Sequence, residues 1–248
     1  MRTVLITGVN GGIGSATAEV FKREGWQVIG VDCVPQRESL SCDEYHVVDL
    51  SDENQINSLF TAVSREDIRL DALVNNAAVQ LCKPLLETAA DEWDALMAVN
   101  LRAAYLVMKS SHPFLCKPGG AIVNVGSVHA RATSRNIAAY AASKGALEAL
   151  TRAVALEFAT DGIRVNGLHP GAVETEMLMA GFRRGHLLSD TVEAQTRQLG
   201  EKHPLNRVGQ PAEIAEAILF LADESRSSFI TGAFLVADGG ALSRLATE

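Results

Sequence analysis

The chain has 248 residues, of which 47% are hydrophobic and 21% charged, a composition that indicates a globular protein and argues against disorder. Its formal net charge is -8, whereas nucleic-acid-binding proteins usually carry a basic surplus, so we expect no nucleic-acid partner. No apolar run approaches the roughly 18 residues that span a bilayer, so we expect no membrane segment either.

The start of the chain and its cysteines both bear on cellular location. The apolar run after Arg2 ends at Gly8 and is too short for the core of a signal peptide. The cysteines are scattered and form no C-x-x-C pair, which is typical of reduced thiols. We therefore expect a cytoplasmic protein.

Short aliphatic or β-branched runs alternate with amphipathic stretches along the chain. Strands are predicted at 3–7, 27–32, 45–49, 72–75, 121–127, 164–168 and 234–236, and helices near 14–24, 52–65, 91–110, 140–160 and 211–222. This alternation predicts right-handed crossovers and a mostly parallel sheet with helices on both faces. No linker or repeat interrupts it, so we predict a single doubly wound α/β domain of the Rossmann type over residues 1–248. The long segment 174–206, of mixed charge, is predicted to be a substrate lid.

The first predicted strand ends in a glycine-rich turn that opens a helix. Residues 7–14 read Thr-Gly-Val-Asn-Gly-Gly-Ile-Gly, with the motif glycines at Gly8, Gly12 and Gly14. Glycines there allow a tight turn and let a pyrophosphate approach the N–H groups at a helix N-terminus. Such a turn alone is weak evidence, but its place between the first strand and the first helix predicts a dinucleotide site.

Asp32 ends the second predicted strand, where a side chain can select between cofactors. A carboxylate there accepts hydrogen bonds from the ribose of NAD and repels the 2′-phosphate of NADP. No Arg or Lys occurs at 10–12 or 33–36, although Arg37 follows closely. We therefore predict NAD. Asp49, at the end of the third predicted strand, has two interpretations: a contact with the adenine, or a helix cap.

Tyr140 and Lys144 begin a helical stretch and share one face of it, because they are four residues apart. Lys144 continues into an apolar stripe that includes Leu147 and Val154, and a buried cation there requires a role. An ammonium near a phenol favours the phenolate, so it is expected to lower the tyrosine pKa for acid–base work. The pattern Y-x-x-x-K by itself often arises by chance.

Two further polar residues give this pair a context. Ser127 ends a predicted buried strand thirteen residues before Tyr140, so both are expected to border the crevice where open α/β sheets bind ligands. Asn100 lies within the apolar stripe of the 91–110 helix, and a buried amide must be hydrogen-bonded. Asn100 is therefore either a clamp on a neighbouring backbone or a direct participant in the chemistry.

Together these motifs resemble those of the short-chain dehydrogenase/reductase family over nearly the whole chain. The resemblance rests on the glycine turn, Asn75-Asn76-Ala77-Ala78, Asn100, Ser127, Tyr140 with Lys144, Pro170-Gly171-x-Val173-x-Thr175 and Asp238-Gly239-Gly240. The family commonly has Gly where Ala78 stands, and Ser or Thr where Gly126 stands. Neither departure removes a functional group.

The resemblance implies an NAD-dependent oxidoreductase that interconverts a secondary alcohol and a ketone by hydride transfer. Tyr140 would be the general acid/base, and Lys144 would hold the nicotinamide ribose and lower the tyrosine pKa. Ser127 would bind the substrate oxygen, and Asn100 would support a proton relay through water. The implied cofactor contacts are Gly8, Asn10, Gly12, Ile13, Gly14, Asp32, Asp49, Leu50, Asn76, Ala77, Ala78, Tyr140, Lys144, Pro170, Gly171, Val173 and Thr175. No metal is expected.

The resemblance also implies a homo-oligomer, either a tetramer or a dimer. A small-residue face on the 140–160 helix, formed by Ala142, Gly145, Ala149 and Ala153, either packs between subunits or faces its own sheet. The substrate pocket is expected to include Gln80, His129, Arg131, Arg135 and the segment 176–205. Arg183, Arg184 and His186 of that segment either clamp an anionic substrate or are solvated loop charges.

Two alternatives remain. An NADPH-dependent 3-oxoacyl-carrier-protein reductase resembles this chain in length and motifs, although Asp32 and the acidic net charge argue against it. A non-catalytic NAD-binding regulator would need the glycine turn but not Tyr140.

Overall fold

A computed structural model of the chain describes residues 1–65, 69–115, 119–182 and 191–243. Within them, one sheet of seven parallel strands has the order β3-β2-β1-β4-β5-β6-β7. The strands are β1 (Thr3–Thr7), β2 (Gln27–Asp32), β3 (Glu44–Val47), β4 (Ala72–Asn75), β5 (Ala121–Val125), β6 (Arg164–Pro170) and β7 (Phe234–Ala237). The strand order reverses between β1 and β4, which makes this a doubly wound, Rossmann-like α/β fold.

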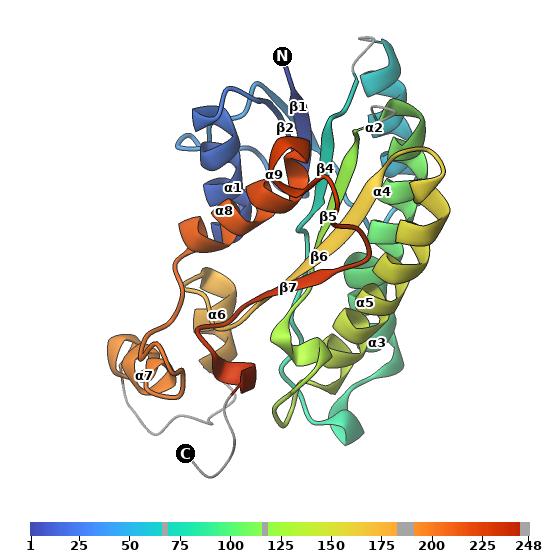
Figure 1. Cartoon of the computed structure of the whole chain (residues 1–248). Helices are drawn as coiled ribbons and strands as arrows, with labels where there is room; N and C mark the ends of the chain where they lie inside the picture. The colour runs from blue at the N-terminus through green and yellow to red at the C-terminus, as the bar shows by residue number, and fades with distance from the viewer. Residues whose placement is uncertain (66–68, 116–118, 183–190, 244–248) are drawn as a thin grey trace.

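Helices cover both faces of the sheet (Figure 1). On one face α1 (Gly12–Arg23) packs against α8 (Pro211–Ala222), and on the other lie α2 (Glu53–Arg65), α4 (Ala103–Ser111) and α5 (Ala138–Ala159). Shorter helices are α3 (Ala90–Met97), α6 (Glu176–Gly181), α7 (Val192–Gly200) and α9 (Glu224–Ser227). The carboxyl ends of the strands point toward α6 and the start of α5 (Figure 1).

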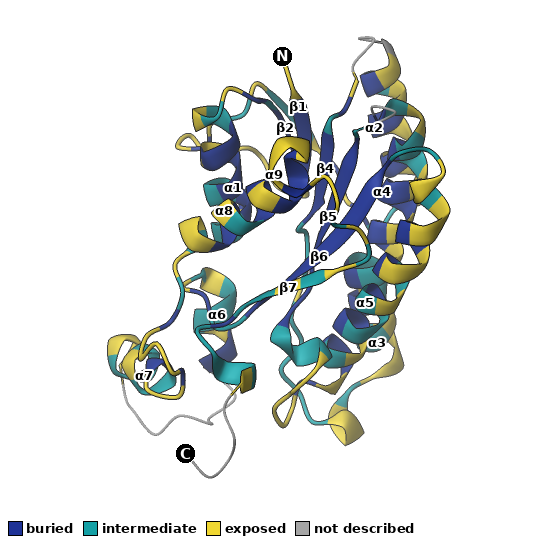
Figure 2. Ribbon diagram, viewed as in Figure 1, coloured by how far each residue is buried: buried dark blue, intermediate teal, exposed yellow. Residues whose placement is uncertain are grey.

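The central strands are buried on both faces (Figure 2), as parallel strands between two helical layers must be. Successive side chains of a strand point to opposite faces. Val4 and Ile6 of β1 therefore join the core beneath α1 and α8, while Leu5 joins the core beneath α2 and α4. This two-sided packing holds the carboxyl edge of the sheet in a fixed place.

The predicted fold class and strands are confirmed, with differences at several strand boundaries. β3 ends at Val47, and β5 ends at Val125, so Ser127 lies beyond its strand, whereas β6 extends to Pro170. The single helix predicted at 91–110 is instead α3, a π-helical segment Ala98–Arg102 and α4. The predicted lid contains α6 and α7.

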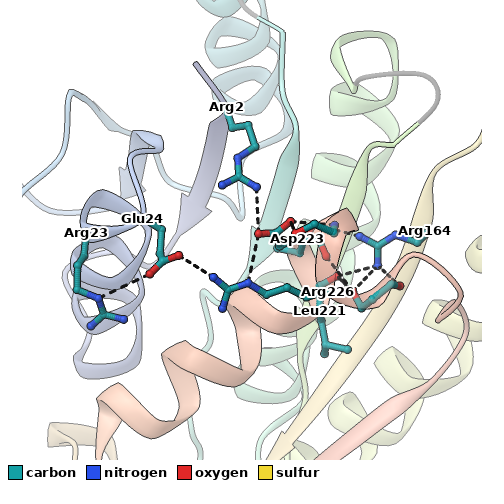
Figure 3. A network of polar contacts seen from close by, with 10 residues as sticks. Arg2, Arg23, Glu24, Arg164, Leu221, Asp223 and Arg226 are labelled. Atoms are coloured by element: carbon teal, nitrogen blue, oxygen red, sulfur yellow. Dashed lines mark hydrogen bonds and ion pairs between the residues drawn. The ribbon is translucent and has the colours of Figure 1, made fainter.

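Arg164, the first residue of β6, joins the sheet to the end of α8 (Figure 3). Its guanidinium is buried and donates to the carbonyl oxygens of Leu221 at 2.8 Å and Ala222 at 3.0 Å, and to Ser227 Oγ at 2.9 Å. The last carbonyls of a helix have no partner within the helix, so these bonds satisfy groups that would otherwise be orphaned. Burial lowers the pKa of Arg164.

We expect Arg164→Met to lower the free energy of unfolding by about 2–4 kcal/mol, because it leaves several buried carbonyls without a donor. Arg226, 40% exposed in its side chain and paired with Glu24 and Asp223, is the matched control. Arg226→Met should cost less than about 1 kcal/mol, as surface ion pairs do. Urea unfolding followed by circular dichroism measures both, and equal losses would contradict the role given to Arg164.

Candidate active site

The residues singled out in the sequence meet in one cavity at the carboxyl edge of the sheet. Its volume is about 730 Å³, in the range of small-molecule and cofactor sites. The lining includes nearly all the expected cofactor residues together with Ser127, Tyr140 and Lys144. Gly14 and Asn100 are absent from that lining and lie behind it, where each supports a wall.

The glycine turn has the shape that a pyrophosphate requires. Gly8 has φ +65°, and a Cβ there would lie 2.7 Å from Ala77 Cα; a Cβ on Gly14 would lie 2.2 Å from the Gly8 oxygen. The turn therefore cannot accept larger residues at either position. Gly11, the N-cap of α1, provides no side-chain cap, and the first turn of α1 has no acidic residue. The helix thus presents uncapped N–H groups to the cavity, which suits a phosphate.

The turn at Asn75–Ala78 is tied directly to the glycine turn. The Asn76 amide donates to the backbone oxygens of Thr7 and Gly8, both at 3.0 Å, and the Thr7 hydroxyl accepts from the N–H groups of Asn76 and Ala77 at 3.0 Å. Two walls of the cavity, from β1 and β4, are therefore held at a fixed separation.

Asp32 lies at the end of β2 with its carboxylate beside the glycine turn. Its Oδ2 accepts from the Asn10 N–H at 3.0 Å. Asn10 in turn donates to the Pro35 oxygen at 3.0 Å and to the Tyr45 hydroxyl at 2.7 Å, which secures the loop after β2. Arg37, the one cation near this carboxylate in the sequence, pairs instead with Glu176 at 3.2 Å.

Asp49 forms a local turn before α2 and does not cap the helix, as one of its two predicted interpretations would have it, because Asp52 accepts the Asn54 N–H at the helix start. Its Oδ1 accepts from the N–H of Ser51 at 2.8 Å and from the Ser51 hydroxyl at 2.7 Å. The side chain is exposed, and the residue also lines the cavity. The geometry therefore gives Asp49 a turn-forming role and leaves a ligand contact as a prediction.

Tyr140 and Lys144 lie one turn apart on α5, and both are buried. Lys144 Nζ donates to the Val125 oxygen at 2.8 Å and lies 5.7 Å from the centroid of the Tyr140 ring. Burial lowers the pKa of Lys144 to about 8. Burial also raises the pKa of Tyr140 to about 12, against an opposing hydrogen bond with Ser127. The direction is opposite to the lowering that we expected, because desolvation of the buried phenol outweighs its polar contacts.

Asn100 acts in the structure as a clamp on neighbouring backbone. Its Oδ1 accepts from the Val79 N–H at 2.8 Å, and its Nδ2 donates to the Val79 oxygen at 2.9 Å and the Ser143 hydroxyl at 3.1 Å. It lies in the π-helical segment, whose wider turn interrupts the α3–α4 helix. Asn100 therefore links the wall after β4 to α5, one residue away from Lys144.

The sequence analysis missed a pair of residues behind Ser127, the buried His169 and the half-buried Glu148. His169, on β6, accepts the Ser127 N–H at its Nδ1, 3.1 Å away, and its Nε2 lies 2.8 Å from Glu148 on α5. A Cβ on Gly126 would lie 2.5 Å from His169 Nδ1. Gly126, where the family commonly has Ser or Thr, therefore leaves the space that the His169 ring occupies. The available signals were a histidine within a buried strand and a glutamate four residues after Lys144.

The substrate end of the cavity holds only some of the expected residues. Gln80 and His129 line it, as do Met177, Leu178, Lys202 and His203 of the expected segment 176–205. Arg131 pairs with Glu148 at 3.3 Å instead. Arg183, Arg184 and His186 lie outside the described residues.

The described part of the chain contains neither a metal-binding cluster nor a membrane-spanning helix. No group of three or more His, Cys, Asp or Glu side chains there is arranged to hold a metal ion. Within the same residues, no helix combines the length and apolar character needed to cross a membrane.

We expect Lys144→Met to stabilise the protein at pH 7 by about 1–3 kcal/mol, because each unit of pKa depression costs about 1.4 kcal/mol and the lost bond to Val125 offsets part of the gain. The folded pKa of about 8 lies below the ordinary 10.5, so between these values the folded protein binds fewer protons than the unfolded chain. Wild-type stability therefore gains from this group as pH rises through that window.

The advantage of methionine should accordingly narrow between pH 8 and pH 10.5. Urea unfolding of both proteins at pH 7, 9 and 10 provides the measurement. A difference that stays constant across this range would show that the buried ammonium does not cause it.

Comparison with known proteins gives the family. A family model described as Enoyl-(Acyl carrier protein) reductase matches residues 8–241. Cyclopentanol dehydrogenase of Comamonas sp. (strain NCIMB 9872) is 34% identical over 250 residues, 96% of this chain and 96% of that protein. The 3-oxoacyl-[acyl-carrier-protein] reductase FabG of Thermotoga maritima is 35% identical over 251 residues, 96% of this chain and 97% of that protein.

Solved structures agree. Ligand-free aldohexose dehydrogenase of Thermoplasma acidophilum superposes with a TM-score of 0.91 at 30% identity, covering 99% of this chain and 95% of that one. A 4-hydroxyisoleucine dehydrogenase complexed with NADH gives 0.87 at 28% identity (99% and 100% covered), and ElxO with NADP bound gives 0.84 at 30% (98% and 99% covered). The chain therefore belongs to the short-chain dehydrogenase/reductase family of oxidoreductases, which bind a nicotinamide cofactor.

Proposed function

We propose that this protein interconverts a secondary alcohol and a ketone with NAD, using Tyr140 as the general acid/base. One observation carries the proposal: Ser127, Tyr140 and Lys144 are buried side by side in the cavity that also contains the glycine turn. A protein that only sensed the cofactor would need the glycine turn but not a buried phenol and ammonium beside it.

The cofactor would be held by the N-terminus of α1 and by Asp32, and when bound it would supply or accept the hydride. In ketone reduction Tyr140 gives its hydroxyl proton to the substrate oxygen, to which Ser127 also donates. Lys144 is largely protonated at neutral pH, since its pKa is about 8, and its charge stabilises the phenolate that Tyr140 leaves. Asn100 joins the backbone after β4, at Val79, to Ser143 on α5, and it would support the return of a proton through water. Alcohol oxidation reverses these transfers.

Tyr140→Phe should lower kcat by about 10²–10⁴-fold, because that is the typical contribution of general acid–base catalysis and the variant has no proton to transfer. Binding of NADH, followed by its fluorescence, should stay within about twofold, since only one hydroxyl is removed. NADH oxidation is measured with a panel of ketones, each with and without a carboxylate, beginning with cyclopentanone because of the similarity to cyclopentanol dehydrogenase. Tyr140-independent turnover would refute the mechanism.

The preference for NAD is carried by Asp32. Its carboxylate faces the glycine turn and accepts from Asn10, and Arg37, the nearest cation in sequence, is engaged by Glu176. A 2′-phosphate would meet this negative charge without a compensating cation.

Asp32→Asn tests the charge while keeping an oxygen for the Asn10 N–H. We expect its kcat/KM with NADPH to rise about tenfold or more and that with NADH to fall, because repulsion and one ribose acceptor are removed together. Arg37→Gln is the control, and it should change kcat/KM with NADPH and with NADH by no more than about twofold each. A wild-type preference for NADPH would overturn the assignment.

A second candidate is an acyl-carrier-protein reductase. The description of the matching family model and the 35% identity to the Thermotoga maritima FabG favour it. It differs from the first proposal in its substrate, a 3-oxoacyl thioester, and in its use of NADPH. Turnover of acetoacetyl-coenzyme A with NADPH in preference to simple ketones with NADH would select this candidate.

We also propose that the protein is a cytoplasmic homo-oligomer, a tetramer or a dimer. The small-residue face of α5 turns away from its own sheet: Ala142, Ala149 and Ala153 are exposed, and Leu156 nearby is 78% exposed. This arrangement supports the first of the two interpretations of that face, close packing between subunits.

A further inference from the structure

We propose that His169 is a positioning residue that fixes Ser127 through its backbone, and that Glu148 holds His169 in the tautomer this requires. The inference rests on the proposed function, in which Ser127 binds the substrate oxygen. It assigns a role to a buried histidine that lies behind the catalytic residues and lines no part of the cavity.

The hydrogen-bond pattern determines the protonation of the ring. Nδ1 receives the Ser127 N–H at 3.1 Å, so Nδ1 must be unprotonated and act as the acceptor. Nε2, 2.8 Å from Glu148 Oε2, must then carry the proton and donate to the carboxylate. A neutral ring protonated at Nε2 is the one form that satisfies both contacts. The side chain is fully buried, and burial lowers the pKa of His169 against the opposing effect of Glu148.

The His169 ring is fixed by stacking, by hydrogen bonds at both nitrogens and by close packing against Gly126. It stacks on Phe234 with centroids 4.3 Å apart and an interplanar angle of 21°. Glu148 is itself fixed by Arg131 at 3.3 Å and Arg152 at 2.8 Å. Gly126 leaves the space that the ring fills, because a Cβ there would lie 2.5 Å from Nδ1. The imidazole therefore cannot shift without moving several partners.

Ser127 depends on this support because it lies beyond the end of β5. Its backbone is extended, with φ -167° and ψ 154°, and its hydroxyl accepts from the His129 N–H at 3.2 Å. β5 ends at Val125, and the last ladder bond in this stretch is the donation of the Gly126 N–H to the Leu168 oxygen at 2.7 Å. The next N–H, that of Ser127, goes to the His169 side chain. The His169 side chain thus accepts the first backbone N–H beyond the ladder, and that N–H belongs to Ser127, the residue whose hydroxyl would bind the substrate.

Two amide substitutions separate the two contacts. The side-chain oxygen of asparagine falls near Nδ1 of a histidine and can accept from Ser127, whereas the nitrogen of glutamine falls near Nε2 and can donate to Glu148. Both remove the ring and its stacking on Phe234. Asparagine, which is one methylene shorter, loses more packing than glutamine, so packing alone would make His169→Asn at least as damaging as His169→Gln. The hydrogen bonds predict the opposite order: His169→Gln should lose the support of Ser127, and His169→Asn should retain most of it.

The experiment uses the purified wild-type and both variants with NADH and the panel ketone that the wild type reduces. We expect kcat of His169→Gln to fall about 10- to 100-fold, as a misplaced catalytic group does, with the dissociation constant for NADH within about twofold. His169→Asn should recover kcat to within about threefold of wild type. The Ser127 amide resonance in a ¹⁵N–¹H spectrum should move in the glutamine variant and stay near its wild-type position in the asparagine variant.

A second pair guards against a variant that does not fold. Glu148 is at the half-buried side of α5; Glu148→Gln keeps an oxygen for Nε2–H, whereas Glu148→Ala frees the ring to take the other tautomer, which would oppose the Ser127 N–H. The alanine variant should lose more kcat and shift the Ser127 amide further than the glutamine variant. If the two members of each pair had equal effects on kcat and on the Ser127 amide resonance, the proposal would be overturned, and lost packing would be the only explanation.

Failure of the proposed function has a different signature. In that case the wild type shows no Tyr140-dependent turnover at all, and the Ser127 amide resonance then decides the inference by itself. A resonance that responds equally to His169→Asn and His169→Gln would overturn it.

Discussion

The burial of the Lys144 ammonium is the constraint on which the rest of the site depends. A cation with almost no solvent contact is held by one bond to the Val125 oxygen, at the end of β5. Such a group is costly to bury, and the cost is visible in its lowered pKa. It can be kept there only because β5 and α5 are fixed to each other by the core. The same fixed pair of elements sets where Tyr140 and Ser127 meet.

Around that centre the structure is divided between two tasks. The side of the cavity at β1, β2 and β4 is built from backbone and small residues: glycines that admit no Cβ, and the Asn76 amide that joins two turns. The side at β5, β6 and α5 is built from buried polar side chains whose hydrogen bonds leave little freedom. The wall of backbone and glycines suits a long ligand that lies against it. The wall of fixed polar side chains suits a reaction at a single substrate atom.

The sequence was sufficient for the fold because its signals are local. Buried strands show as short aliphatic runs, and the glycine turn and Tyr140 with Lys144 follow fixed spacings. It was not sufficient where a residue's meaning comes from a partner far along the chain. Asn100 could be a clamp or a participant until its bonds to Val79 were known. His169 gave no periodic signal, and Gly126 was merely a departure from a pattern until the ring was found in its space. The π-helical segment was missed because one wide turn leaves the apolar stripe almost intact.

The contact of α1 with α8 has a consequence for how the protein is made. Arg23 pairs with Glu216 of α8, 193 positions away, and Arg226 of the following α9 pairs with Glu24, 202 positions away. Figure 3 draws the second of these pairs. The helix that opens the dinucleotide site therefore lacks its packing neighbour until synthesis has passed residue 222. Until then the side of α1 that packs against α8 is exposed, and apolar surface left open in a nascent chain favours aggregation. The ligand-binding half, although encoded first, is thus among the last parts to acquire its native surroundings.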